Sequence, residues 1–440
     1  MSRRIDIIGT GVGPGTLTLE AREAIAQADI LVGSSRLIRE YAHEGQQTAE
    51  VSRPDQVLAV LRGANRGTEA LPTPIRAPQN PDGARIGDSQ LPQPRFAPRQ
   101  GTTAVLMSGD VGFHSGASAV YAGLQEEESR DVRLIPGVSA PVAFAARLGI
   151  PWEDAHLVSC HIPGHNLTSS VRRHFRTIAL TGGNVPALAQ DLIDAGYTDL
   201  QTWAGEDLGL SQERITRTTI ADLLNRQWSP LTILMIENPD WDAKVRSGIS
   251  DEEFTRSDIP MTKSEIRAYA LSRLALKPTD VCWDIGCGTG SVTVEMALAT
   301  YDGGVWAVDS NSAAAELTRT NCRRFHIGNV TVCEGSAPEA LADWPIPDAV
   351  FIGGTSGAMD SIVGHALARN PHARIVVTAI AVESVAAAIA ALRTHGIDPD
   401  LTQLTVARSR TAGGLHLLMG LNPVTVITGQ PHLHLGNGET

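Results

Sequence analysis

Aromatic residues are scarce in this sequence, at 4% of its 440 residues, and long apolar runs are missing. Few aromatics argue against a surface that stacks the bases of single-stranded nucleic acid. A formal net charge of −12 argues against a protein that coats nucleic acid. No segment approaches the roughly 20 apolar residues that cross a membrane. We therefore expect no nucleic-acid partner and no membrane span, while a local arginine-rich cleft for an anionic ligand stays open.

Cysteine is also sparse, and none of the five cysteines has CxxC spacing. An odd number of cysteines, several of them in or beside expected strands, is typical of buried thiols in a reducing cytoplasm. We expect a cytoplasmic protein without a metal site. The cysteines are Cys160, Cys282, Cys287, Cys322 and Cys333.

The length predicts two domains, because one core rarely serves 440 residues. The pattern restarts near the acidic, turn-rich "GISDEEF" at 248–254, so we place the domains at 1–245 and 246–440. Residues 62–101 hold seven prolines without periodicity. They predict an irregular surface insertion, either a loop without a role or a substrate lid.

Apolar runs alternate with helical patterns throughout, which predicts an α/β protein. In the first half, one helix is expected near Ala21–Ala28. In the second half, Thr262 and Glu265 have the spacing of a capping box at the start of a helix over 262–276. Five βα units and a final hairpin there predict a doubly wound sheet with an antiparallel edge. The expected strands are 5–8, 103–107, 132–135, 156–159, 177–180, 231–236, 281–285, 305–309, 330–333, 349–352, 375–378, 401–407, 415–421 and 424–427.

The second half contains a glycine turn, "DIGCGTG", directly after an expected strand. A dinucleotide site would use the order GxGxxG, whereas the order here is GxGxG with Asp284 just before it. A carboxylate beside the turn suits a cationic ligand, and Asp309 closes the next strand, where an acid can bind ribose hydroxyls. The pattern favours S-adenosylmethionine (AdoMet); NAD or a purely structural turn are the alternatives. Ala337, after the third strand, is placed to contact the adenine.

The first half carries a different glycine turn, "GTGVGPG" at 9–15, with no ribose-binding acid at the expected distance. Three further turns of small residues stand at strand ends: "SGDVGFHSG" (108–116), "PGVSA" (136–140) and "LTGGN" (180–184). Small residues let the backbone approach a ligand closely. Four such turns predict a pocket built mostly from main chain.

These motifs carry a resemblance to known families. Residues 1–240 resemble the tetrapyrrole methylases, which bind AdoMet between two α/β lobes. Residues 248–428 resemble the Rossmann-type methyltransferase of cobalamin biosynthesis through "SDEEF", "IPMTKSEIRA", "DIGCGTGSVTVEMA", "GSAPEAL" and "NPV". In this order the two halves resemble the fused, decarboxylating precorrin-6B methyltransferases that act on carbons 5 and 15.

The resemblance implies a division of labour and two AdoMet sites. The first half would methylate carbon 5; the second would methylate carbon 15 and decarboxylate the acetate on carbon 12, giving precorrin-8X. One departure from the family is Val111, where Gly-Asp-Pro is usual. The first site would comprise Pro14, Ser108, Gly109, Asp110, Phe113, Ser139, Ala140 and Thr181. The second would comprise Thr262, Gly286, Cys287, Gly288, Thr289, Gly290, Asp309 and Ala337.

The precorrin substrate carries many carboxylates, which arginine binds in bidentate fashion. Arg408 and Arg410 in "VARSRTAGG" are the main candidates, and Arg267 is a weaker one. Glu383, beyond the fifth strand of the second half, is a candidate acid or base. Each of these side chains could equally be an ordinary surface group. His114, His161 and His416 are more typical of packed or exposed histidines.

Three other functions fit parts of the sequence. A nicotinamide-dependent dehydrogenase would use the glycine turns for a different cofactor. An RNA or protein methyltransferase with an accessory AdoMet-binding domain would need a basic face or an NPPY-like tetrapeptide, and strand 349–352 ends instead in "IGGTSG". A binding module would keep AdoMet only for regulation. We expect the chain to act as a homo-oligomer.

Overall fold

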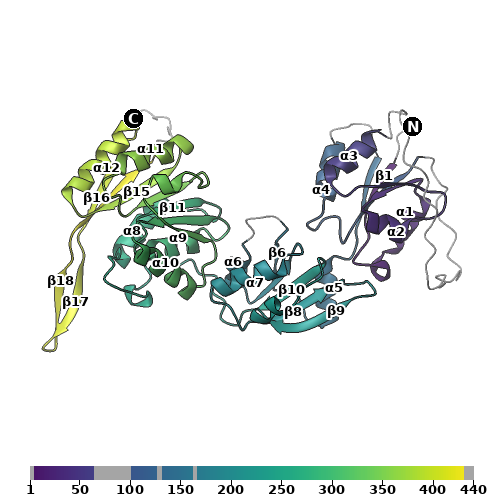
Figure 1. Ribbon diagram of the computed structural model, residues 1–440, viewed down its shortest axis with the longest axis horizontal. Helices are drawn as coiled ribbons and strands as arrows, with labels where there is room; N and C mark the ends of the chain where they lie inside the picture. Colours follow the sequence, from purple (N-terminus) through teal and green to yellow (C-terminus); the bar gives the residue numbers. More distant parts are fainter. Residues whose placement is uncertain (1–3, 64–100, 126–130, 162–165, 431–440) are drawn as a thin grey trace, which may run out of the picture.

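The computed structural model describes residues 4–63, 101–125, 131–161 and 166–430. Its strands form three large sheets that follow one another along the molecule, plus a separate two-stranded hairpin (Figure 1). Most of the expected insertion, residues 64–100, lies outside the described residues. No helix in the described ranges is long and apolar enough to cross a membrane.

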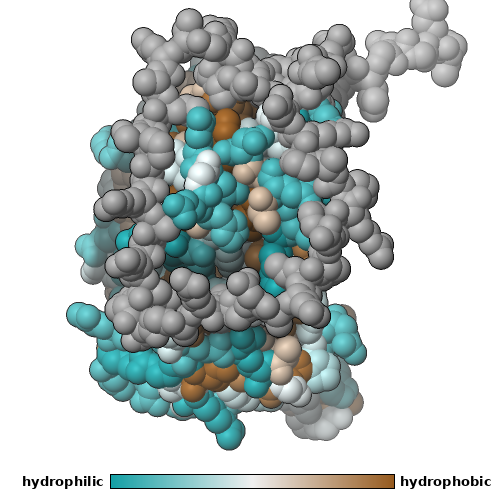
Figure 2. All heavy atoms as spheres, turned by 90° about the vertical axis from the view of Figure 1, so that its right-hand side faces the viewer, coloured by the Kyte–Doolittle hydropathy of each residue, from teal (hydrophilic) through white to brown (hydrophobic). Residues whose placement is uncertain are grey.

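The first sheet is parallel throughout, with the order β3-β2-β4-β1-β5. Alternate residues of β1 point to opposite faces: Ile8 packs with α1 and α2, whereas Ile5 and Ile7 pack with α3 and α4. Figure 2 looks onto this end of the molecule, where the described surface is mainly hydrophilic with small hydrophobic groups. The elements are β1 (Arg4–Gly9), α1 (Leu19–Gln27), β2 (Ile30–Gly33), α2 (Ser35–Tyr41), β3 (Gln47–Glu50), α3 (Pro54–Gly63), β4 (Thr103–Met107), α4 (Ala117–Gln125) and β5 (Asp131–Ile135).

The second sheet has the order β6-β7-β10-β8-β9 and is antiparallel except between β6 and β7. Helices α6 and α7 cover one face, and Phe144 of α5 packs on the other. The parallel first sheet and the mainly antiparallel second sheet, with their helices, form the two α/β lobes expected of the first half. The elements are α5 (Ala140–Leu148), β6 (Ala155–Ser159), α6 (Leu167–Arg173), β7 (Arg176–Leu180), α7 (Val185–Asp194), β8 (Gln201–Glu206), β9 (Arg214–Thr219) and β10 (Thr232–Glu237).

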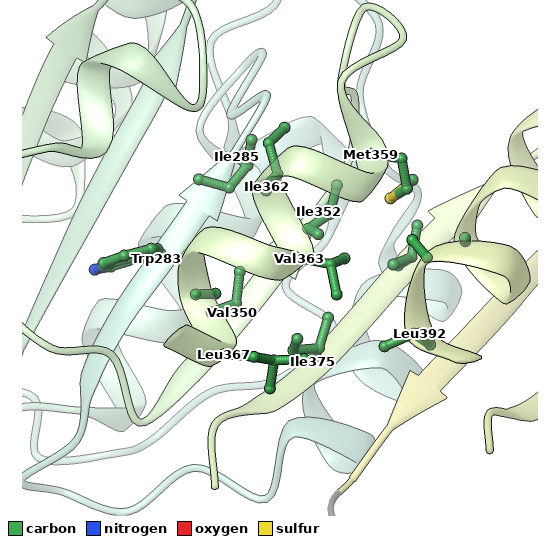
Figure 3. Packing of buried hydrophobic residues seen from close by; sticks show 14 of the residues in the cluster. Trp283, Ile285, Val350, Ile352, Met359, Ile362, Val363, Leu367, Ile375 and Leu392 are labelled. Carbon is green, nitrogen blue, oxygen red and sulfur yellow. The ribbon is translucent and has the colours of Figure 1, made fainter. Parts of the chain in front are cut away.

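The third sheet has the order β13-β12-β11-β14-β15-β19-β16, in which β19 alone runs in the direction opposite to the other six strands. Helices α8, α9 and α10 cover one face, and α11 and α12 cover the other, around Trp283, Val350 and Ile375 (Figure 3). The elements are α8 (Ser264–Leu274), β11 (Val281–Ile285), α9 (Ser291–Ala299), β12 (Gly304–Asp309), α10 (Ser312–Arg324), β13 (Val330–Glu334), β14 (Ala349–Ile352), α11 (Met359–Arg369), β15 (Arg374–Ala379), α12 (Val382–Thr394), β16 (Asp400–Leu404) and β19 (Val424–Gly429).

Between β16 and β19 the chain forms a hairpin of β17 (Ala407–Ala412) and β18 (Leu415–Gly420), which projects away from the sheet (Figure 1). The expected strand 401–407 is therefore wrong at its end, because β16 stops at Leu404. The expected antiparallel edge is confirmed: β19 lies between β15 and β16 and pairs antiparallel with both, and β16 is the edge strand. The described residues also contain four short 3-10 helices: η1 (Pro14–Thr16), η2 (Ala221–Asn225), η3 (Asp251–Glu253) and η4 (Glu339–Leu341).

The expected capping box at Thr262 and Glu265 is wrong. Helix α8 begins at Ser264 after the cap residue Lys263, whose own side chain makes no capping hydrogen bond. Glu265 instead binds Arg408, whose Nε donates to Glu265 Oε1 over 2.9 Å. A long-range ion pair has thus replaced the local hydrogen bond that the spacing predicted.

Candidate functional site

A cavity of about 750 Å³ lies at the carboxyl edge of the third sheet. Its walls come from the ends of β11, β12, β14 and β15 and from the turn after β13. In doubly wound sheets ligands bind at this edge, and the volume lies in the range of small-molecule and cofactor sites. Thr262, Gly286, Cys287, Gly288, Thr289, Asp309 and Ala337 all line it, as expected.

The glycine turn shapes the floor of the cavity. Gly286 and Gly288 have φ angles of 74° and 58°, in the left-handed region that favours glycine. A Cβ on Gly286 would lie 2.8 Å from the backbone nitrogen of Gly354. Gly286 is therefore required both for its backbone conformation and for close packing of the two strand-end turns.

Gly290 departs from the expectation, because it is not among the cavity-lining residues. Its amide donates to the carbonyl of Cys287 over 2.8 Å, and a Cβ there would lie 2.8 Å from Cα of Thr318 on α10. The third glycine of the turn thus lets α9 pack on α10.

Asp284 lines the cavity and is fully buried. Its Oδ2 accepts a hydrogen bond from Thr293, whereas its Oδ1 has no hydrogen-bond partner among the described residues. Burial raises the pKa of this carboxyl to about 7. An unpaired buried carboxylate oxygen fits a cationic group on a ligand, since such a group would favour the ionised form.

Asp309 lies at the end of β12, on the neighbouring part of the wall. Its carboxylate accepts hydrogen bonds from the amides of Gly288 and Asn311, each over 2.9 Å. It is thus held rigidly beside the glycine turn. Cys287 also lines the cavity, and its buried thiol accepts a hydrogen bond from Thr318.

In the first half, three glycines from three strand ends meet. A Cβ on Gly9 would lie 2.7 Å from the carbonyl oxygen of Gly109 and from the nitrogen of Gly137. Asp110 joins two of these turns, since its carboxylate accepts hydrogen bonds from the amides of Gly112 and Gly137 over 2.8 and 3.1 Å. Three of the four expected turns, "GTGVGPG", "SGDVGFHSG" and "PGVSA", therefore meet here, whereas "LTGGN" lies at the end of β7 in the second sheet.

The other expected residues of the first site surround this cluster or lie in the second lobe. Ser108 accepts a hydrogen bond from Arg36, and Pro14 begins η1. Ser139 is the cap residue of α5, and Ala140 begins that helix.

Phe113 packs edge-on against His114, and Thr181 at the end of β7 donates to the carbonyl of Thr232 over 2.7 Å. Val111, the departure from the family pattern, is buried in the core of the first sheet.

The candidate substrate ligands are placed differently from the expectation. Arg267 is 0% exposed and pairs with Asp251 and Glu295, so the expected substrate contact by Arg267 is wrong. Arg408 makes ion pairs with Asp251 and Glu265. Arg408, Arg410 and Glu383 are not among the cavity-lining residues, although Ser384, beside the exposed Glu383, is.

The candidate histidines are exposed and lie apart. His161 Nδ1 lies 3.1 Å from Ser159 Oγ, and His416 pairs with Thr411 in the β17–β18 hairpin.

The sequence analysis missed the wall segment 259–263 beyond Thr262, together with Ser336 and Asn422, all of which line the cavity. Their place inside the quoted family motifs was the signal that could have found them.

Comparison with known proteins assigns both halves. The family model of the tetrapyrrole (corrin/porphyrin) methylases matches residues 4–224, and that of the precorrin methyltransferase domain matches residues 253–430. The precorrin-6Y C(5,15)-methyltransferase (decarboxylating) of Sinorhizobium sp is 31% identical over 338 residues, which are 74% of this chain and 80% of that protein. The chain belongs to the decarboxylating precorrin-6Y C5,15-methyltransferases.

The chain is also similar to shorter proteins. The probable cobalt-precorrin-6B C(15)-methyltransferase (decarboxylating) of Pyrobaculum calidifontis is 42% identical over 184 residues, which are 41% of this chain and 94% of that protein. A solved structure of a precorrin-6Y C5,15-methyltransferase from Geobacter metallireducens is 34% identical, covering 43% of this chain and 98% of that one, with a TM-score of 0.41.

As a precorrin-6Y C5,15-methyltransferase, the chain is an AdoMet-dependent C-methyltransferase of cobalamin biosynthesis that decarboxylates a tetrapyrrole. This confirms the function predicted from the motifs, with a precorrin as substrate. The family assignment excludes the three alternative functions, which were a dehydrogenase, an RNA or protein methyltransferase and a binding module.

Proposed function

We propose that the two halves divide the reactions. Residues 1–245 methylate carbon 5, and residues 246–440 methylate carbon 15 and remove carbon dioxide from the acetate on carbon 12, giving precorrin-8X. Two observations support this division. Separate family models match the two parts of the chain. In addition, the Pyrobaculum calidifontis relative, named only for carbon 15 and decarboxylation, corresponds over 94% of its length to only 41% of this chain.

The carboxy-terminal cavity is the AdoMet site of the second half in this proposal. The observation that carries it is the unpaired, buried Oδ1 of Asp284, a residue that lines the glycine-walled cavity together with Asp309. Bound AdoMet supplies an electrophilic methyl group. Asp284 would hold the ammonium group of the donor, and Asp309 its ribose hydroxyls. Apolar residues of the same cavity, among them Met261, Phe351 and Leu421, would exclude water and align the reacting carbon.

The amino-terminal AdoMet site is proposed at the glycine cluster joined by Asp110. Backbone groups of the three turns approach one another within contact distance there, so a ligand would meet main chain rather than side chains. Gly13 supports a site that extends to the second lobe, since a Cβ on it would clash with the carbonyl of Gly209. Arg410 and Glu383 remain predictions as substrate-binding and acid–base groups.

Product analysis of the full chain tests the division of labour. In Asp309→Ala we expect carbon-5 methylation to continue, while carbon-15 methylation and decarboxylation fall by about a hundred-fold, because the donor loses its ribose anchor. In Asp110→Ala we expect carbon-5 methylation to fall, while carbon-15 methylation and decarboxylation continue. Products formed from the precorrin and isotopically labelled AdoMet are identified by mass spectrometry and NMR. Glu316→Ala, which removes an exposed carboxylate from α10, is the control variant. Loss of both methylations in Asp309→Ala would contradict the division.

We also propose that the chain forms a homo-oligomer through the β17–β18 hairpin. Leu415, Leu417, Leu418 and Met419 are exposed there, Leu418 at 74%, and an exposed apolar strand pair favours burial against another copy. Leu418→Asp is expected to lower the mass measured by light scattering, with Leu19→Asp, exposed on α1, as the control. An unchanged mass would argue against this interface.

The five free cysteines support action in a reducing compartment such as the cytoplasm.

A further inference from the structure

A network of charged side chains joins the β17–β18 hairpin to the wall of the carboxy-terminal cavity. It consists of Asp251, Glu295, Arg267, Arg408 and Glu265, and we call it the charge network. Its first three members are almost completely buried. They come from η3, α9 and α8, while Arg408 comes from β17. The network therefore connects elements that are far apart in the sequence.

Arg267 is the centre of the buried part. Its Nε donates to Glu295 Oε1 over 2.8 Å, and its Nη1 donates to Asp251 Oδ1 over 3.0 Å. The guanidinium also donates to the carbonyl groups of Thr262 and Ile249. Glu295 in turn accepts the amides of Gly248 and Ile249. These bonds fix the segment before α8 against α9.

Arg408 completes the network from the hairpin. Its Nη1 donates to the second oxygen of Asp251 over 2.8 Å, and its Nη2 donates to Ser264 Oγ over 3.0 Å. Asp251 also accepts the amide of Ser264, the first residue of α8. Asp251 is thus held by arginines from two sides, which satisfies a carboxylate that would otherwise be costly to bury.

The wall segment 259–263 lies next to these bonds. All five of its residues line the cavity. Arg267 holds the carbonyl of Thr262 at its end, and Ser264 follows directly. On the other side the segment meets the glycine turn: the carbonyl oxygen of Pro260 lies 3.2 Å from the place of a Cβ on Gly288. The position of the wall therefore depends on the charge network.

We propose that Asp251 and Arg408 are positioning residues for the donor site of the second half. They hold the wall segment against the glycine turn, so the cavity keeps the shape that binds AdoMet. The inference rests on the proposed function of this cavity. It also gives Arg408 a role at the donor site without contact with the substrate.

Arg408→Ala and Arg408→Lys in the full chain test the proposal. The KM for AdoMet in carbon-15 methylation is expected to rise about ten-fold or more in Arg408→Ala and less in Arg408→Lys, which keeps the charge but loses the fork of donors. The kcat is expected to change little, because the wall contributes to binding before the reaction. Carbon-5 methylation serves as the internal reference. Arg393→Ala on α12, which removes an exposed ion pair with Asp398, is the matched control.

A merely structural role would give a different result. Destabilisation lowers the amount of active enzyme, so the apparent kcat would fall with the melting temperature while the KM stayed constant; that result, or an unchanged KM in both variants, overturns the proposal. Asp309→Ala distinguishes failure of the positioning role from failure of the proposed donor site. If Asp309→Ala raises the KM and Arg408→Ala does not, only the positioning role fails. If Asp309→Ala leaves the KM unchanged, the cavity is not the donor site.

Discussion

Gly286→Ala is expected to abolish AdoMet binding in the second half and to destabilise that half. The left-handed φ of 74° costs an alanine about 1–2 kcal/mol. The added Cβ would also lie 2.8–3.0 Å from backbone atoms of Gly354, so two turns that line the cavity must separate. Calorimetric titration with AdoMet is expected to show one binding site fewer than in the wild type, and carbon-15 methylation should be lost.

Gly396→Ala is the control for the cost of the left-handed backbone conformation without the steric clash. Gly396 has a similar φ of 78°, and its Cβ would meet no atom within 4 Å. This variant should lose a comparable 1–2 kcal/mol or so of stability and keep both AdoMet sites. If Gly286→Ala binds AdoMet with wild-type stoichiometry, the glycine turn does not form the donor site.

Donor binding in the second half is expected to weaken as the pH falls below about 7. The pKa of Asp284 is raised to about 7 by burial, so the carboxyl is increasingly neutral below that pH. A cationic ligand binds the ionised form, and protons therefore compete with it. The affinity should fall about ten-fold per pH unit well below 7 and reach a plateau at higher pH.

The stability of the ligand-free protein should change in the opposite direction. Because the folded-state pKa of Asp284 lies above its ordinary value of 3.8, the contribution of this group to stability is lost as the pH rises through about 7. AdoMet should thus stabilise the second half most at high pH. Titrations over the pH range from about 6 to about 8 check this. Asp284→Asn should bind weakly and without this pH dependence; a wild-type affinity that does not change with pH would contradict the role of Asp284.

Much of the proposed donor site of the second half could be predicted from local sequence. A short apolar strand, a glycine turn and an acid at the end of the next strand each depend on neighbouring residues, and the structure brings Asp284, Gly286 and Asp309 to one cavity. Gly290 lies outside the cavity lining, and spacing alone does not distinguish a glycine that meets a ligand from one that meets a helix. Its contact is with Thr318, on α10.

The charged groups could not be placed from the sequence. Arg408 finds its partners Glu265 and Asp251 at separations of 143 and 157 residues, and no local pattern reveals such pairs. Short polar strands were missed for a related reason. β9, with the sequence RITRTT, is largely exposed and has no hydrophobic alternation, so its strand conformation depends on pairing with β8.

Both halves of the chain bind AdoMet in this account, by two unrelated glycine turns. Calorimetric titration of the wild-type full chain with AdoMet tests this claim most directly. The account predicts two saturable sites per chain, one of which disappears in Gly286→Ala. A wild-type chain that binds a single AdoMet would contradict it.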